Sequence, residues 1–199
     1  MDDSEARLWF DYVDPVSFLV ELRLRRVEAR VGAPVARRGW EIAPPPAPPP
    51  DVSGPAWSGR WRAVARAAEE EGLELAPPRR IPWSRKAHEL ALHAAGAGAF
   101  EAVHDALFRA YHLEGRDIGR IDVLTELATA CGLDRGEVRT VLGVDRWVPE
   151  VLEGREAAER LGLRGVPTLA RGDTRLEGLA DEDAIAGLLG RGSGTERAD

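Results

Sequence analysis

The pattern of apolar and polar residues is clearest near the start of the chain. An apolar, aromatic run over residues 8–13 gives way to a stretch over residues 16–31 in which apolar residues recur at helical spacing. Asp14 and Pro15 separate the two segments. Aspartate is a favourable helix N-cap, and proline is a favourable first helical residue. The sequence therefore predicts a buried strand that enters a helix through a tight, capped turn.

A second group of strand patterns marks the end of the chain. Residues 168–171 and 174–178 are predicted to pair as a hairpin through a Gly-Asp turn. Asp181 follows and is predicted to cap a last helix. Nearer the start, residues 34–42 form a shorter and more polar strand pattern, which favours a position close to a sheet edge.

The region between these ends is predicted to be helical. Residues 43–50 hold six prolines in eight positions, which excludes a helix and favours an extended connection. Residues 73–82 hold three prolines and are predicted to be extended for the same reason. The apolar periodicity predicts helices over residues 57–71, 83–95, 100–111, 121–131, 134–142 and 146–161.

Composition narrows the class of protein. The chain of 199 residues carries a formal net charge of −7, which argues against a nucleic-acid partner because such a partner usually requires a basic surface. No apolar run approaches the roughly 18 residues of a membrane span, and the first residues are acidic rather than signal-like. We therefore expect a cytoplasmic protein with no membrane partner.

The cysteine and histidine residues offer little chemistry. Cys131 is the only cysteine, so no disulfide can form within the chain, and its place on an apolar stripe favours a buried packing residue. His88 and His93 are one residue further apart than in the zinc-protease motif, which turns the second side chain about 140° away from the first. His104 and His112 lie elsewhere in the sequence. We expect no metal site.

The capped turn resembles a known motif. Asp14, Pro15, Val16 and Ser17 stand where the DsbA branch of the thioredoxin superfamily carries C-P-x-C between its first strand and helix. Gly165-Val166-Pro167-Thr168, before the predicted hairpin, resembles that family's cis-proline loop. Similarity to FrnE-type members extends over residues 84–91, 100–101, 104–111, 115–119 and 154–168.

The resemblance implies an α/β, thioredoxin-like fold (βαβ–ββα) with a DsbA-like helical insertion. The thioredoxin-like domain is then expected over residues 7–58 and 163–190, with the insertion over residues 59–162. Residues 191–199 are polar and are expected to form a disordered tail.

The resemblance also defines the candidate site. It places the family's redox pair at Asp14 and Ser17, so both sulfurs are missing, and thiol–disulfide exchange needs a thiolate and a resolving sulfur. What remains is the N-terminus of the first helix, a candidate anion site. The groove between this N-terminus and the proline loop is expected to hold a peptide or a small molecule. The expected contacts are Pro15, Trp83, Val166 and Pro167.

Asp11 and Asp14, which lie near the turn, could each be a structural residue or a functional carboxylate. For Asp14 we favour a helix cap over a general base or a cation ligand. Asp11 is expected to point toward the protein interior. On a strand the two carboxylates would face opposite sides, so we do not expect a paired-acid site.

Two functions stay open. The favoured one is a non-redox ligand-binding protein without a cofactor. The alternative is a glutathione-dependent isomerase or transferase, because kappa-class glutathione transferases and 2-hydroxychromene-2-carboxylate isomerases share the fold and use serine at the first motif position. Asp14 would repel a thiolate there, Ser17 matches only the last position, and Trp83 stands where that branch carries a small polar residue. The sequence leaves a homodimer open.

Overall fold

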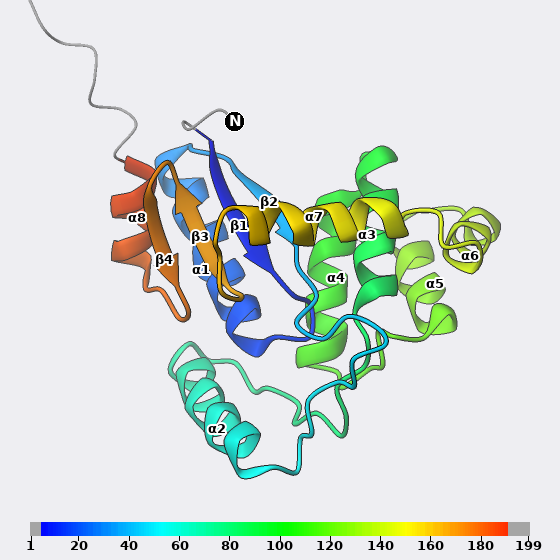
Figure 1. Ribbon diagram of the computed structural model, residues 1–199, viewed down its shortest axis with the longest axis horizontal. Helices are drawn as coiled ribbons and strands as arrows, with labels where there is room; N and C mark the ends of the chain where they lie inside the picture. Colours follow the sequence, from blue (N-terminus) through cyan, green and yellow to red (C-terminus); the bar gives the residue numbers. More distant parts are fainter. Residues whose placement is uncertain (1–4, 191–199) are drawn as a thin grey trace, which may run out of the picture.

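A four-stranded sheet in the order β2-β1-β3-β4 forms the centre of the fold (Figure 1). The computed structural model describes residues 5–190, except the side chains of Ala56 and Arg60. The tail expected over residues 191–199 lies outside the described residues.

The pairing of the strands follows the predicted layout. β1 (Ala6–Phe10) pairs in parallel with β2 (Val35–Gly39) and antiparallel with β3 (Thr168–Arg171). β3 turns into β4 (Thr174–Glu177), which confirms the predicted hairpin. β2 lies at one edge of the sheet, as its polar pattern predicted.

Helices cover both faces of this sheet (Figure 1). α1 (Pro15–Val31) and α8 (Glu182–Gly190) pack against each other on one face. α7 (Val148–Arg160) crosses the other face and contacts β2. α7 falls within the region assigned to the insertion from the sequence, yet it packs on the thioredoxin-like sheet.

Alternation along β1 divides the core between the two faces, because successive side chains of a strand point to opposite sides. Leu8 and Phe10 belong to the main core, which α1 also enters. Trp9 belongs to a smaller cluster with Ala158 of α7 and Ala170 of β3. The aromatic run at the start of the chain is therefore buried from both sides.

The remaining helices lie between β2 and β3 in the sequence, and most of them form a bundle beside the sheet (Figure 1). Within the bundle, α3 packs against α4, α5 and α6, and α5 packs against α6. α2 stands apart from the bundle and contacts α1. The helices are α2 (Pro55–Glu70), α3 (Arg85–Gly96), α4 (Phe100–His112), α5 (Ile121–Ala130) and α6 (Arg135–Gly143).

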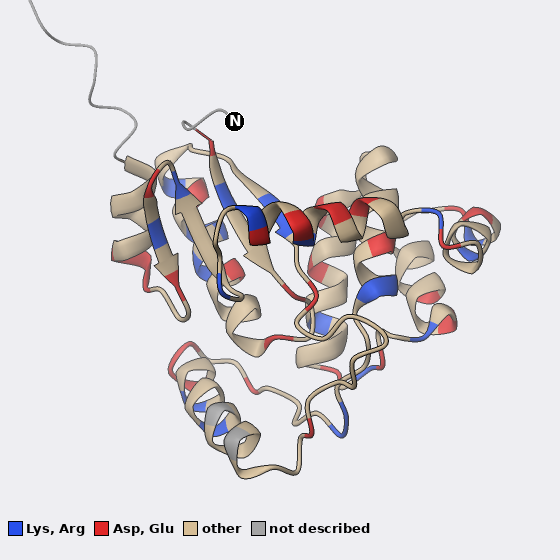
Figure 2. Ribbon diagram, viewed as in Figure 1, with Lys and Arg blue, Asp and Glu red and all other residues tan. Residues whose placement is uncertain are grey.

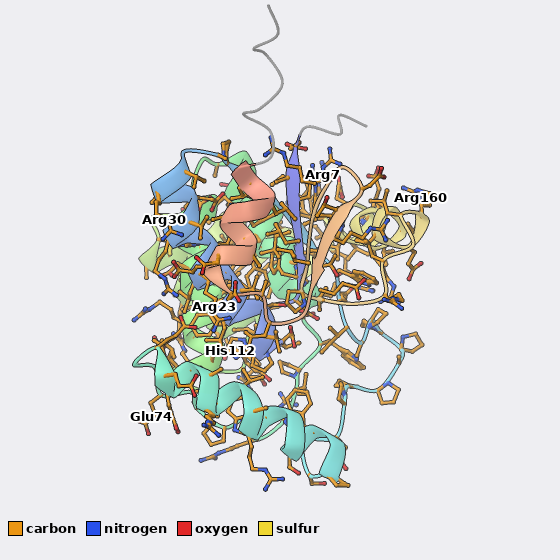
Figure 3. All side chains as sticks on the ribbon, turned by 90° about the vertical axis from the view of Figure 1, so that its left-hand side faces the viewer. Arg7, Arg23, Arg30, Glu74, His112 and Arg160 are labelled. Carbon is orange, nitrogen blue, oxygen red and sulfur yellow. The ribbon has the colours of Figure 1, made fainter. Side chains whose placement is uncertain are left out.

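Ion pairs connect α1 to the elements around it. Arg23 pairs with Glu71, just after α2, at 2.6 Å, and Arg30 pairs with Glu182 of α8 at 3.2 Å. Figure 3 shows both arginines along α1, beside α8. Figure 2 shows basic and acidic residues interspersed over the elements that face the viewer. Among the helices of the described region, none is long and apolar enough to cross a membrane.

Candidate functional site

Asp14 caps α1, as the sequence predicted. Its Oδ2 accepts a hydrogen bond from the backbone N–H of Ser17 at 2.8 Å and another from the Ser17 hydroxyl at 2.7 Å. Pro15 is the first residue of the helix. Asp14 is 2% exposed and Ser17 is fully buried. The anion site at the N-terminus of α1 is therefore filled by a carboxylate of the protein itself.

The Ser17 hydroxyl is committed to this cap. It donates to Asp14 Oδ2 and accepts a hydrogen bond from the backbone N–H of Asp11 at 3.4 Å. A hydroxyl has one proton to donate. Ser17 therefore cannot donate to a bound thiolate while the contact with Asp14 stands.

A pocket of about 650 Å³ opens beside the capped turn. Asp14 and Val166, which lie far apart in the sequence, both line it. Its other walls come from the segment after β2, the start of α2, and Arg155 of α7. The Val166–Pro167 peptide bond is cis, and Pro167 directly follows the wall residue Val166. The structure thus brings the capped turn and the proline loop together around one cavity.

The remaining predicted contact residues lie outside the pocket wall. Pro15 and Pro167 are buried and are not among the residues that line the pocket. Trp83 is 46% exposed, and its indole N–H donates to the carbonyl of Ala47 at 3.0 Å. Trp83 therefore holds the proline-rich connection against the start of α3 instead of lining the pocket.

Several wall residues were not identified from the sequence. Trp40 and Glu41, directly after β2, and Trp57, on α2, all line the pocket. Glu41 is 1% exposed, and its Oε2 accepts from Arg85 at 2.9 Å. Arg155 donates to the backbone carbonyl of Glu41 at 2.7 Å. Glu41 Oε1, in contrast, is buried and has no hydrogen-bond partner in the described structure. The wall therefore combines aromatic surface with a partly paired carboxylate. No local sequence pattern links these segments.

A buried polar network lies behind the site. Asp11 points toward the interior, as expected, where its carboxylate accepts from the backbone N–H of Ile42 at 2.7 Å and contacts His88 Nε2 at 3.1 Å. The Tyr12 hydroxyl lies 2.7 Å from His104 Nδ1. His112 Nε2 donates to the Tyr12 carbonyl at 2.9 Å. Within residues 5–190, no group of three or more His, Cys, Asp or Glu side chains could hold a metal ion.

Cys131 is less buried than the sequence predicted. It lies at the end of α5, is half-buried, and packs against the main core. Burial, together with the charge of Asp105, raises the pKa of its thiol. The prediction of a packing residue is supported, but full burial was wrong, because the side chain stands at the helix end and not within its buried face.

The structure predicts the effect of removing the cap. We expect Asp14→Ala to lower the free energy of unfolding by about 1–2 kcal/mol, because the N–H and the hydroxyl of Ser17 both lose their acceptor. Asp14→Asn keeps an acceptor oxygen and is the matched control. Urea denaturation measures both variants. An Ala variant as stable as the original chain would contradict the capping role.

Comparison with known proteins agrees with this architecture. Residues 6–190 match the family described as the DSBA-like thioredoxin domain. The uncharacterized protein YwbO of Bacillus subtilis (strain 168) is 27% identical over 194 residues, which cover 90% of this chain and 92% of YwbO. A probable DsbA oxidoreductase from Streptomyces coelicolor superposes with a TM-score of 0.83 and 25% identity, over 98% of this chain and 92% of the other.

A fourth comparison concerns an isomerase. A 2-hydroxychromene-2-carboxylate isomerase superposes with a TM-score of 0.77 and 19% identity, and the match covers 94% of each chain. At this level of identity the similarity shows a shared fold and nothing about shared chemistry.

Proposed function

The chain belongs to the DSBA-like thioredoxin domain family, and within that family we propose that it is a non-redox protein that binds a peptide or a small ligand in the pocket between the N-terminus of α1 and the Val166–Pro167 loop. The proposal includes no cofactor and a cytoplasmic location.

The sulfur content supports a non-redox role. Cys131 is the only cysteine in the sequence, and it lies at the end of α5, away from the residues that line the pocket. Dithiol exchange needs a thiolate that attacks and a second sulfur that resolves the mixed disulfide. One half-buried thiol outside the pocket supplies neither function there.

The filled helix N-terminus is the observation that carries the proposal. In a thiol enzyme of this fold, the positive end of the helix dipole would stabilise a thiolate. Here the Asp14 carboxylate accepts from the backbone N–H of Ser17 at that end of α1. The adjoining pocket of about 650 Å³ has the size of a small-molecule or peptide site, and it keeps aromatic and apolar walls.

The same observation counts against the alternative, a glutathione-dependent isomerase or transferase. That chemistry needs a donor for the glutathione thiolate at the first motif position. Asp14 offers an anion there, and the Ser17 hydroxyl already donates to Asp14. Like charges at hydrogen-bond distance repel, so a thiolate is disfavoured at this position.

A binding assay with two probes tests the proposal. One probe is fluorescently labelled insulin B chain with carboxymethylated cysteines, and the other is the apolar dye 8-anilinonaphthalene-1-sulfonate. We expect at least one probe to bind saturably, and Val166→Asp to weaken that binding roughly tenfold or more, because it buries a charge in the pocket wall.

Val144→Asp is the matched control, since Val144 is 67% exposed and lines neither this pocket nor any other cavity described for the chain. Absence of binding by both probes, or equal binding by the two variants, would contradict the proposal.

A further inference from the structure

A second cavity, of about 640 Å³, lies beside β2 and shares no wall residue with the pocket at Asp14. β1, β2, α3 and α7 form its walls, with Phe100 at the start of α4. Much of the surface is apolar, including Trp9, Leu92, Phe100 and Leu161. A cavity of this size and polarity is suited to a small molecule.

His88 supplies a buried polar group to this wall. The side chain is 3% exposed, and its Nε2 lies 3.1 Å from Asp11 Oδ1. Asp11 also accepts from the backbone N–H groups of Ile42 and Val13, so its carboxylate is held from three directions. A carboxylate oxygen is the acceptor in this contact, so Nε2 is the nitrogen that donates, and in the neutral ring Nδ1 is then an acceptor.

Nδ1 of His88 has no hydrogen-bond partner among the described residues. His104 Nε2, which lies 3.5 Å from Glu21 Oε1, and His112 Nδ1 also make no hydrogen bond, but those two atoms are sealed from solvent, and Nδ1 of His88 is not among the sealed atoms. Of these three buried histidines, only His88 lines the cavity, and its Nδ1 faces Gly39, another residue of the cavity wall.

Two glycines allow β2 and α7 to approach the His88 side chain closely. A Cβ on Gly39 would lie 2.4 Å from His88 Nδ1, which is far closer than real atoms approach. A Cβ on Gly154 would lie 3.1 Å from the carbonyl of Gly39. Both glycines line the cavity, so β2 and α7 approach His88 closely without side chains between them.

A second acceptor lines the same cavity. Glu150 Oε2 is buried and has no hydrogen-bond partner in the described structure. The charged residues at the cavity have both signs, since Arg7, Arg37 and Arg38 lie there with Glu150 and Glu153, and Figure 2 shows both signs on β2 and α7. Two unpartnered acceptors in an apolar cavity require hydrogen-bond donors, and the mixed charges do not favour an ion.

We propose that this cavity is a second ligand site, independent of the pocket at Asp14, for a small and mainly apolar molecule that carries an N–H or O–H group. The ligand donates to Nδ1 of His88, and Asp11 fixes the tautomer that makes this nitrogen an acceptor.

Indole and 1-methylindole are matched probes, because they have the same apolar shape and only indole has an N–H donor. We expect indole to bind roughly tenfold more tightly in isothermal titration calorimetry, the value of one buried hydrogen bond. His88→Phe should remove this preference. His93→Phe, on the same helix but outside the cavity, should keep it.

Chemical modification of the original chain gives a second measurement that does not depend on the folding of a variant. Diethylpyrocarbonate acylates accessible, unprotonated imidazole nitrogens. We expect mass spectrometry to find His88 modified faster than His104 and His112, and indole to protect it.

Equal binding of the two probes, no binding of indole, or modification of His88 as slow as that of His104 would overturn the inference. Val166→Asp should leave indole binding unchanged. The proposed ligand site at His88 and the proposed pocket at Asp14 are therefore tested independently of each other.

Discussion

The double variant Asp14→Cys, Ser17→Cys should catalyse the reduction of insulin by dithiothreitol, whereas the original chain should stay at the uncatalysed rate. The two side chains already meet, since the Ser17 hydroxyl lies 2.7 Å from Asp14 Oδ2. The N-terminus of α1 would lower the pKa of the cysteine at position 14, and the second cysteine would resolve the mixed disulfide. The fold therefore retains the frame of a dithiol site and lacks only its sulfurs.

Two controls test which sulfur atoms any activity requires. Asp14→Cys alone supplies the attacking thiolate without the resolving sulfur and should stay well below the double variant. Cys131→Ser should leave the original chain at background. Activity of the original chain that survives Cys131→Ser would contradict the sulfur-based argument. Equal rates in all three chains would mean that the pocket does not admit a disulfide substrate.

Acid should destabilise the protein steeply, beginning near neutral pH. Burial lowers the pKa of His112 from 6.5 to about 3, and burial also lowers the pKa of His104. Burial alone would raise the pKa of Glu21, but contacts with His104 and the Arg37 guanidinium outweigh it and lower the pKa to about 2. In each case the folded chain binds fewer protons than the unfolded chain, so falling pH favours unfolding.

The size and the pH range of this effect follow from the pKa values. His112 should reduce the free energy of unfolding by about 1.4 kcal/mol per pH unit below pH 6.5, the lowered pKa of His104 should act in the same direction, and Glu21 should add to the loss below pH 4.5. For His112 the loss ends near pH 3. Urea denaturation across this range measures the slope.

His112→Gln is the test variant, because its amide can donate to the Tyr12 carbonyl, as His112 Nε2 does at 2.9 Å, and cannot titrate. The variant should be less steeply destabilised by acid than the original chain. A stability that stays constant from pH 6.5 to pH 4.5 would contradict the assignment of neutral, buried histidines.

Local rules were sufficient to predict the elements around the candidate site. An apolar run, then aspartate and proline, then helical periodicity predicted β1, the Asp14 cap and α1, because each signal acts over a few neighbouring residues. The hairpin of β3 and β4 followed from its turn, and the position of β2 followed from its polarity. The resemblance to the DsbA branch then placed the proline loop opposite the capped turn.

Contacts between segments that lie far apart in the sequence could not be predicted from local sequence patterns. The pocket wall joins Trp40, Trp57 and Arg155, and no periodicity or spacing relates these residues. His88 was assigned no role, because its partner Asp11 is 77 positions away and its setting depends on Gly39 having no side chain. Trp83 was expected at the ligand site from the family resemblance. Its indole N–H instead donates to Ala47.

Thermal unfolding with glutathione tests the central claim most directly, namely that the Asp14 carboxylate fills the N-terminus of α1 and bars a thiolate ligand. A ligand that binds the folded state raises the melting temperature by mass action. We predict that millimolar glutathione leaves the melting temperature of the original chain unchanged, and that any rise is confined to Asp14→Ser, which removes the charge and keeps a capping hydroxyl. A clear rise for the original chain would contradict the account.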